Sequence, residues 1–301
     1  MAVYTKPFDW MVKYTYQQEW GLKRGIWLWL ALVLGGLGSG LYLVALYFLY
    51  PPAMVVGWLI AVVLKGTCHM LYLGKPIRAW RAFTRPHTSW ISRGLIFVTG
   101  FGFFAGLQTA AVFFTDLPWN AQSLFLNVLV ILFAFLLMIY PGFLLSYVYA
   151  IPLWNNALLP VVFVLYAFLG GLGLFLPIGV SGGLDHASLI AVEKGIRFFI
   201  LTSSTVLALY LVSVGQANPA GKESLLSILT GNFSFTFYGG VLVLGILIPL
   251  FSSLFSYVTN SLSIPLLYTA MICELIGSFL LRFCVLKAGI YMPLVSVKKQ
   301  Y

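Results

Sequence analysis

Long apolar runs alternate with short polar connections along most of the chain. A helix needs about 20 consecutive apolar residues to cross the roughly 30 Å hydrocarbon layer of a bilayer. Runs of that length predict eight transmembrane helices, and the short connections leave no room for a separate soluble domain. The expected spans are 25–49, 54–73, 91–114, 122–147, 154–178, 196–214, 234–258 and 262–286.

This pattern predicts an all-α integral membrane protein, a single polytopic membrane domain over residues 1–301. Two Gly-rich segments, LGGLGSG at 34–40 and LGGLGLF at 169–175, recur in the first and fifth spans. Small residues let helices approach closely in lipid, so both segments should lie at helix contacts. Their recurrence indicates two four-helix bundles, helices 1–4 over 25–147 and helices 5–8 over 154–286, with chance similarity as the alternative.

The fourth apolar run contains Tyr140-Pro141-Gly142 deep inside it. Proline removes a backbone donor and clashes with the preceding turn, so this tripeptide predicts a distorted helix with a freed carbonyl. Such a break either lines a cavity or is a structural kink.

The composition agrees with a membrane protein, because 61% of the residues are apolar and 8% are charged, against about a quarter charged in soluble domains. Cytoplasmic loops of membrane proteins collect Lys and Arg, which places both termini in the cytoplasm and the chain in the cell (inner) membrane. The alternative is that the cations serve an acidic partner subunit. Fourteen of the seventeen Lys and Arg residues fall on one predicted side, namely Lys6, Lys13, Lys23, Arg24, Lys75, Arg78, Arg81, Arg85, Arg93, Lys222, Arg282, Lys287, Lys298 and Lys299.

Charged side chains are costly inside a bilayer, so each one is a candidate functional group. Lys65, His69 and Tyr72 are spaced four and three residues apart, which puts them on one face of the second helix. Glu274 and Arg282, eight residues apart, share nearly one face of the eighth helix. Lys65, Glu274 and Arg282 are candidates for a proton path. The alternative is that these groups fix packing through ion pairs and hydrogen bonds.

The sequence predicts no metal cofactor in this chain. A haem with two His ligands needs paired histidines at membrane depth, and only His69 falls within a span. The three cysteines, Cys68, Cys273 and Cys284, are too scattered for an iron–sulfur cluster or a zinc site. Membrane topology accounts for the net charge of +10, so no nucleic-acid partner is expected. Because no metal cofactor is predicted in this chain, electrons for any redox function must come from another subunit.

Three stretches together resemble one family. They are YLGKPIRAWRAFTRPHTSWISRG (72–94), YPGFLLSYVYAIPLWNNALLP (140–160) and EWGLKRGIWLWLALVLGGLGSGLYL (19–43). They are similar to the NrfD/PsrC family, the membrane subunits of polysulfide reductase and its relatives, with the sulfoxide-reductase anchors of the DmsC type as neighbours. The resemblance covers most of residues 19–175, while the second half matches mainly in helix count.

The resemblance implies a membrane subunit that binds a quinone, menaquinone or ubiquinone, and exchanges electrons with a ferredoxin-like iron–sulfur subunit. A molybdopterin catalytic subunit often completes such complexes, and proton translocation is an open addition. Tyr140 matches the family's quinone-contacting tyrosine. The family's Asn and His in the first helix fall near Leu28 and Ala31, which are apolar here.

A quinone needs a flat apolar slot with a hydrogen-bond donor at each carbonyl. Substitutes for the missing first-helix donors could come from the second helix and its link or from the segment before helix 1. The link also brings Trp90 and Arg93 to the border of the slot. The candidate donors are His69, Tyr72, Arg78, Gln17, Gln18 and Glu19.

Two other functions remain open from the sequence. In a secondary transporter or ion channel, Lys65, Glu274 and Arg282 would line the substrate path and broken fourth and fifth helices would form a midplane site. In a scaffold without a ligand, Tyr140 and Lys65 would be packing features.

Overall fold

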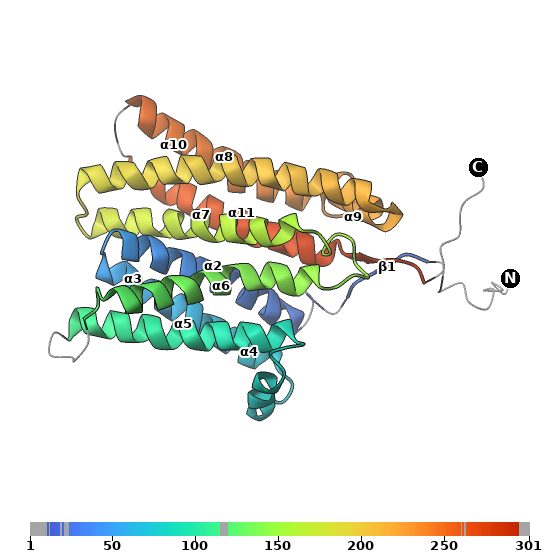
Figure 1. The fold of residues 1–301 in the computed structure, drawn as a ribbon. Coiled ribbons are helices and arrows are strands. Elements are labelled where there is room, and N and C mark those ends of the chain that lie inside the picture. Colours follow the sequence, from blue (N-terminus) through green and yellow to red (C-terminus); the bar gives the residue numbers. More distant parts are fainter. Residues whose placement is uncertain are drawn as a thin grey trace.

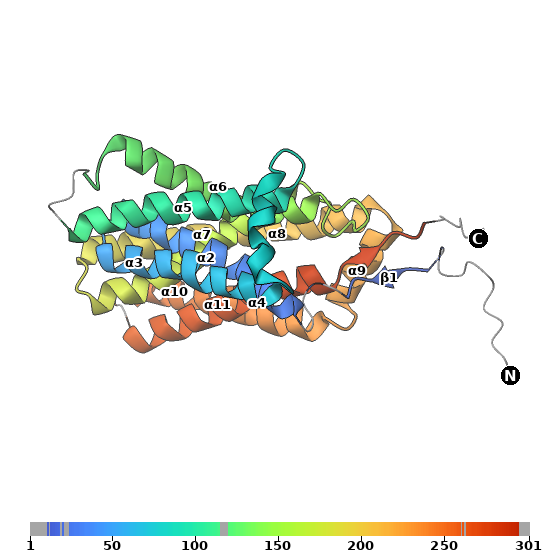
Figure 2. The same cartoon turned by 90° about the horizontal axis from the view of Figure 1, so that it is seen from below.

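The computed structural model describes residues 11, 13–18, 20, 24–114, 120–259, 261 and 263–294. Within them, eight helical segments are long and apolar enough to cross a membrane, so the predicted all-α membrane fold is confirmed. Figure 1 shows these segments packed side by side, and Figure 2 shows the same bundle after a quarter turn. The spans are α2 (Gly25–Tyr47), α3 (Pro51–Trp58) with η1 (Leu59–Leu64) and α4 (Lys65–Tyr72), α5 (Trp90–Phe113), α6 (Leu124–Ser146), α7 (Leu158–Ser181), α8 (His186–Ala217), η3 (Thr236–Leu247) with α10 (Ile248–Thr259), and α11 (Ile264–Lys287).

The two ends of the bundle differ. Strand β1 (Thr15–Tyr16) pairs antiparallel with β2 (Ile290–Tyr291) where α2 begins and α11 ends, and we call this the ribbon end. Successive spans alternate in direction, so the η2 link (Pro76–Thr84) and α9 (Pro219–Leu229) also lie toward the ribbon end (Figure 1). The α2–α3, α5–α6, α7–α8 and α10–α11 connections lie at the opposite end, which we call the far end.

Polar caps fix where three of the spans begin. Ser89 Oγ accepts a hydrogen bond from Ser92 N at 3.4 Å at the start of α5. Asp185 Oδ2 accepts one from Ser188 N at 2.9 Å at the start of α8, and Ser123 caps α6 in the same way. These side chains satisfy backbone donors that have no partner within the helix.

The sixth span is longer than its apolar run indicates. Helix α8 begins at His186 and spans 32 residues, so the expected start at 196 was wrong. The charges at Glu193, Lys194 and Arg197 interrupt the apolar run, yet they lie inside the helix. Glu193 and Arg197 lie one turn apart and pair with each other at 3.7 Å, which makes their place in the helix less costly.

The prolines do not interrupt the fourth and fifth helices, while the distortion and freed carbonyl expected at Tyr140-Pro141-Gly142 stay a prediction. Helices α6 and α7 stay α-helical through Pro141 and Pro177. Transmembrane helices tolerate proline because neighbouring groups compensate the backbone. The non-α turns lie elsewhere, in the π-helical segments η1 and η3. Single π turns inside α-helices are frequent at functional sites.

The two Gly-rich segments pack against each other at the centre of the bundle, so the prediction that both lie at helix contacts is confirmed. A Cβ added to Gly40 of α2 would lie 2.1 Å from Ala167 O of α7. A Cβ added to Gly171 of α7 would lie 2.4 Å from the carbonyl carbon of Gly40. Only glycine allows the two backbones to approach so closely.

The remaining spans arrange themselves around this contact. Helix α2 packs on α3 to α4 and on α6, and α5 closes the ring between α3 and α6. Helix α7 packs on α8 and α11 in the same manner, and the η3 and α10 span closes the second ring. The α2–α7 contact therefore joins two rings of four spans.

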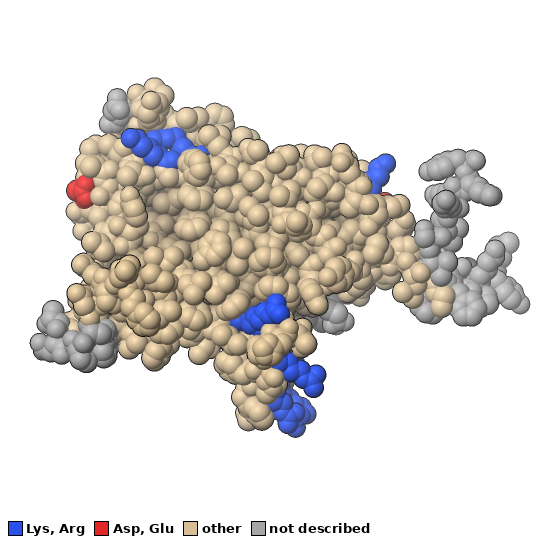
Figure 3. Space-filling view, in the orientation of Figure 1, with Lys and Arg blue, Asp and Glu red and all other residues tan. Residues whose placement is uncertain are grey.

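The basic link folds as the 3₁₀ helix η2, which projects sideways near the ribbon end (Figures 1 and 2). A 3₁₀ helix has three residues per turn, so Ile77, Trp80 and Phe83 share one face, and all three are exposed. Arg78 and Arg81 share the next face. Figure 3 shows cationic side chains gathered at this projection beside a largely uncharged flank of the bundle.

Candidate functional site

Tyr140 lies on α6 about two turns before the ribbon end, and it is 3% exposed. Its ring packs against α5, where a Cβ added to Gly94 would lie 2.4 Å from Tyr140 Cε2. The Phe97 ring meets the Tyr140 ring edge-on, with 6.5 Å between the centroids. The ring is thus fixed from two sides, while Tyr140 Oη has no hydrogen bond to another described residue.

Lys65 is the charged group nearest to this ring. Its Nζ lies 5.5 Å from the Tyr140 ring centroid, and the residue is 3% exposed. Lys65 begins α4 directly after the π-helical η1. The side chain runs over Gly35 of α2, where an added Cβ would lie 2.7 Å from Lys65 Cε. A glycine on α2 therefore makes the space that lets a lysine reach Tyr140.

The other candidates from the second span and its link lie at different distances from Tyr140. His69 is half-buried one turn after Lys65, and its Nδ1 lies 3.3 Å from Lys65 O. Tyr72 is half-buried and packs against the core. Arg78 is exposed on η2, outside the bundle. The structure groups Tyr140, Lys65 and His69 and leaves Arg78 at the surface.

Trp90 and Arg93 lie at the start of α5, just before Gly94, the residue that packs on the Tyr140 ring. Trp90 stacks on Phe143 of α6 with centroids 4.9 Å apart and the rings 9° from parallel. The Arg93 guanidinium lies 4.6 Å from the Trp90 ring centroid. Arg93 Nε and Nη2 donate to Pro86 O and His87 O, both at 2.8 Å, so this guanidinium folds the link back onto α5.

Glu274 and Arg282 form a second buried cluster on α11, and each is 3% exposed. Arg282 Nη1 donates to Ser278 Oγ at 2.6 Å, while Arg282 Nε has no partner among the described residues. Both carboxylate oxygens of Glu274 and the hydroxyl of Tyr166 also lack a hydrogen-bond partner there. Four buried polar atoms close together without partners are unusual, because most buried polar groups in proteins are hydrogen-bonded.

Adjacent glycines of α2 bring the two clusters near each other. Lys65 lies over Gly35, and a Cβ added to Gly36 would lie 3.6 Å from Arg282 Nη2. The two cations thus contact neighbouring positions of α2, Lys65 from the first ring of spans and Arg282 from the second. The three candidates for a proton path, Lys65, Glu274 and Arg282, are all buried at the middle of the bundle.

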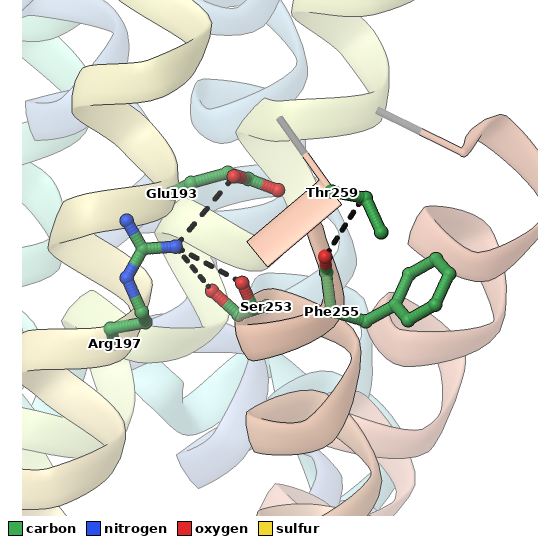
Figure 4. Close-up of polar contacts among 5 residues, drawn as sticks. All are labelled: Glu193, Arg197, Ser253, Phe255 and Thr259. Atoms are coloured by element: carbon green, nitrogen blue, oxygen red, sulfur yellow. Dashed lines mark hydrogen bonds and ion pairs between the residues drawn. The ribbon is translucent and has the colours of Figure 1, made fainter. Parts of the chain in front are cut away.

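Sequence reasoning missed one polar group, which Figure 4 shows between α8 and α10. Arg197 pairs with Glu193 and donates from Nη1 to Ser253 Oγ at 3.0 Å and to Ser253 O at 3.2 Å. The spacing of four between Glu193 and Arg197 was the available signal. It was hidden because the predicted sixth span began at 196, which left Glu193 outside the helix and Arg197 at its edge.

The segment before helix 1 contributes little to the Tyr140 region. Gln17 is buried, and its amide donates to Leu286 O at 2.6 Å and to Trp20 O at 2.5 Å, so it anchors the ribbon end. Gln18 is exposed, and Glu19 lies outside the described residues. Leu28 and Ala31, at the positions of the resemblance's first-helix donors, are buried and apolar.

The residues described in the structure hold no cluster of three or more His, Cys, Asp or Glu side chains that could bind a metal ion. Cys68, Cys273 and Cys284 are free thiols.

Eight spans enclosing buried cations, a carboxyl and an uncommitted tyrosine define a multi-pass α-helical membrane protein with polar sites between its helices. Residues 12–293 match the family model described as "Polysulphide reductase, NrfD". The chain therefore belongs to the NrfD family, and the resemblance seen in its sequence motifs is confirmed.

Two curated relatives agree with this assignment. The protein NrfD homolog of Haemophilus influenzae is 30% identical over 166 residues, which cover 54% of this chain and 52% of that protein. Protein NrfD of Escherichia coli is 30% identical over 175 residues, with the same two shares. The chain spans about half the length of the curated relatives it matches.

Proposed function

We propose that this chain is the quinone-binding membrane subunit of a multi-subunit oxidoreductase. It would exchange electrons between the membrane quinone pool and an iron–sulfur subunit that works with a molybdopterin catalytic subunit. The observation that carries the proposal is the pairing of Tyr140 with Lys65. A phenol without a hydrogen-bond partner among the described residues and an ammonium group lie 5.5 Å apart, centroid to nitrogen, in an apolar part of the bundle.

The residues present fit a quinone, either menaquinone or ubiquinone. A quinone site needs apolar and aromatic walls and a few donors, because reduction places negative charge on the carbonyl oxygens. Phe97 and the stacked Trp90 and Phe143 supply flat apolar surface near Tyr140. Tyr140 Oη and Lys65 Nζ supply the two donors.

A bound quinone would supply two-electron, two-proton chemistry that no side chain offers. Tyr140 Oη would donate a hydrogen bond to a quinone carbonyl oxygen, and Gly94 and Phe97 hold its ring in place. Lys65 Nζ places positive charge where negative charge develops. His69, bonded to Lys65 O, is the titratable neighbour through which protons reach the ribbon end.

The roles proposed for the link residues differ. Trp90 and Arg93 shape the slot, since the guanidinium is held by two backbone carbonyls and lies on the indole. Tyr72 is a half-buried donor near the mouth of the slot. Arg78, exposed on η2, meets the lipid headgroups or the iron–sulfur partner.

We also propose that Lys65, Glu274 and Arg282 serve as a proton path coupled to turnover. Burial of three ionisable side chains in membrane spans is costly and marks functional positions by default. Lys65 and Arg282 contact the adjacent α2 positions Gly35 and Gly36, and in this proposal the path crosses α2 there.

The ribbon end is the proposed docking side. It carries the η2 projection with Lys75, Arg78, Arg81 and Arg85, and an acidic electron-transfer subunit complements such a surface. Because cytoplasmic loops collect Lys and Arg, the proposal has this end facing the cytoplasm and the chain in the inner membrane.

The alternative of a secondary transporter or ion channel has less support. That alternative required broken fourth and fifth helices as a midplane site, and α6 and α7 run through Pro141 and Pro177 as α-helices.

Mild-detergent purification of the tagged chain from its own organism tests the proposal. The expected result is copurification of a subunit with iron–sulfur clusters, together with quinone extracted from the complex at about one molecule per chain. Isolation of a stable single chain that moves a solute across liposomes, without any redox partner, would contradict it.

A further inference from the structure

A small cavity, partly open to the surface of the bundle, lies in the second ring of spans, on the far-end side of Glu274. Its volume is about 30 Å³, and it is bordered by α7, α8, α10 and α11. A cavity needs roughly 10–15 Å³ to hold one water molecule, so this one has room for water. Its polar lining consists of Glu193, Ser252, Ser253 and Glu274.

Glu274 is the inner boundary of the cavity. Its carboxylate oxygens have no hydrogen-bond donor among the described residues, although the residue is buried, with 3% of its surface exposed. A Cβ added to Gly173 of α7 would lie 2.7 Å from Glu274 Oε2, so glycine leaves the space that this carboxyl occupies. A bound proton or a water molecule would satisfy the uncommitted oxygens.

Glu193 is the outer boundary. It lies on α8 two turns after Asp185, the residue that caps the helix at the far end. Glu193 is 8% exposed and pairs with Arg197 at 3.7 Å, and Arg197 is tied to Ser253 of α10 (Figure 4). The carboxyl therefore touches the cavity on one side and a cation anchored near the far end on the other.

We infer that this cavity is a proton-exchange route that connects Glu274 with the far end through Glu193. A proton passes from water at the far end to the Glu193 carboxylate, then to cavity water, then to the Glu274 carboxylate. Each transfer breaks one O–H bond and forms one, and no oxidant or reductant takes part. Serine hydroxyls of Ser252 and Ser253 can accept and donate along the way.

Other charged or titratable groups also face the two carboxyls. Arg282 and Tyr166 lie on the ribbon-end side of Glu274, and Arg197 lies beside Glu193. Tyr166 Oη has no partner among the described residues, so it offers a competing route toward the ribbon end. The cavity favours the far-end route because Glu193 and Glu274 both line it.

The route is a property of this chain alone, and only its use during turnover rests on the proposed function. Infrared spectroscopy of the full chain in liposomes tests it without quinone or partner subunits. A protonated carboxyl has a C=O stretching band that shifts when its proton is replaced by deuterium. Glu274→Gln should remove a band that the matched control Glu223→Gln, an exposed carboxyl on α9, leaves in place.

Transfer of the liposomes into D₂O buffer then measures how fast the proton on the Glu274 carboxyl exchanges with solvent. Glu193→Gln should slow the deuterium shift of the Glu274 band by roughly 100-fold, as expected when a positioned proton carrier is removed. Tyr166→Phe should leave the rate unchanged. Ser252→Val fills the cavity and leaves both members of the Glu193–Arg197 pair in place, and it should slow the deuterium shift as well. This variant replaces Glu193→Gln in the test if Glu193→Gln does not fold.

Three results would overturn the inference. The first is a Glu274→Gln spectrum identical to that of the unmodified chain. The second is slow exchange in Tyr166→Phe with normal exchange in Glu193→Gln and Ser252→Val. The third is loss of the band on addition of sodium chloride at constant pH, which would make the cavity a sodium site. Copurification of redox partners bears on none of these results, so failure of this route and failure of the proposed function are distinguishable.

Discussion

Gly35 and Gly94 each leave space that a buried candidate side chain occupies, Lys65 at Gly35 and Tyr140 at Gly94. The sequence predicted Tyr140, Lys65 and His69 as candidates from motif and helical spacing. It did not predict that Lys65 approaches Tyr140, because that contact depends on which glycine of a neighbouring helix lies opposite. Glu193 was missed because the charged residues near the start of α8 interrupt its apolar run, so this part of the helix was not predicted.

Gly94→Ala tests the fixed position of Tyr140. The added methyl would lie 2.4 Å from Tyr140 Cε2, so the ring must move. We expect a loss of about 1–3 kcal/mol in the free energy of unfolding, as is typical of overpacked sites. Thermal unfolding in detergent measures this change.

The matched control is Gly66→Ala on α4, where an added Cβ meets no heavy atom within 4 Å. Alanine is the better helix former by up to about 1 kcal/mol, so this variant should be as stable as the parent or slightly more so. Equal stability of the two variants would show that Tyr140 is not held by α5.

The helices follow the apolar pattern closely, and the departures have physical causes. Seven of the eight predicted spans begin within a few residues of the observed helices, while α8 begins ten residues early because a polar cap and an internal ion pair extend it. Pro141 and Pro177 do not break their helices. The π-helical turns of η1 and η3 have no single-residue signature, so periodicity could not locate them.

Gly40→Ala tests the contact between α2 and α7. The new Cβ would lie 2.1 Å from Ala167 O, a backbone atom that no rotamer change can move. Because the helices must separate, we expect a larger loss than for a side-chain clash, on the order of 3 kcal/mol or more. Gly102→Ala on α5, whose nearest neighbour would be a Val62 methyl at 3.4 Å, is the control. Size-exclusion profiles and melting temperatures of the two variants should differ clearly, and equal values would contradict the proposed close packing.

The whole molecule combines a ribbon end rich in cations with two buried polar clusters that lie on either side of the α2–α7 contact. The number of spans and the all-α class could be predicted from the sequence, because a long apolar segment in lipid satisfies its backbone hydrogen bonds by forming an α-helix. The division into halves at 25–147 and 154–286 stays a prediction. The membrane orientation also stays a prediction, because it rests on the distribution of Lys and Arg between the two ends.

Reporter fusions measure the orientation directly. A fluorescent protein that matures only in the cytoplasm, fused after residue 301, should fluoresce, and alkaline phosphatase at the same position should be inactive. A phosphatase fusion in the α7–α8 turn, at Gly183, should be active. The reverse pattern would mean that the cations of η2 serve a partner outside the cytoplasm.

The central claim is that Tyr140 donates a hydrogen bond to the quinone. Quinol-linked turnover of the purified complex carrying Tyr140→Phe tests it most directly, because phenylalanine keeps the ring contacts with Gly94 and Phe97 and removes only the hydroxyl. Tyr42→Phe is the matched control, since that hydroxyl lies 3.0 Å from Ala105 O in the core away from the proposed slot. We predict unchanged assembly for both variants and a turnover lower by roughly 100-fold for Tyr140→Phe alone, the usual cost of removing one donor to a developing oxyanion. Normal quinol-linked turnover in an assembled Tyr140→Phe complex would contradict the account.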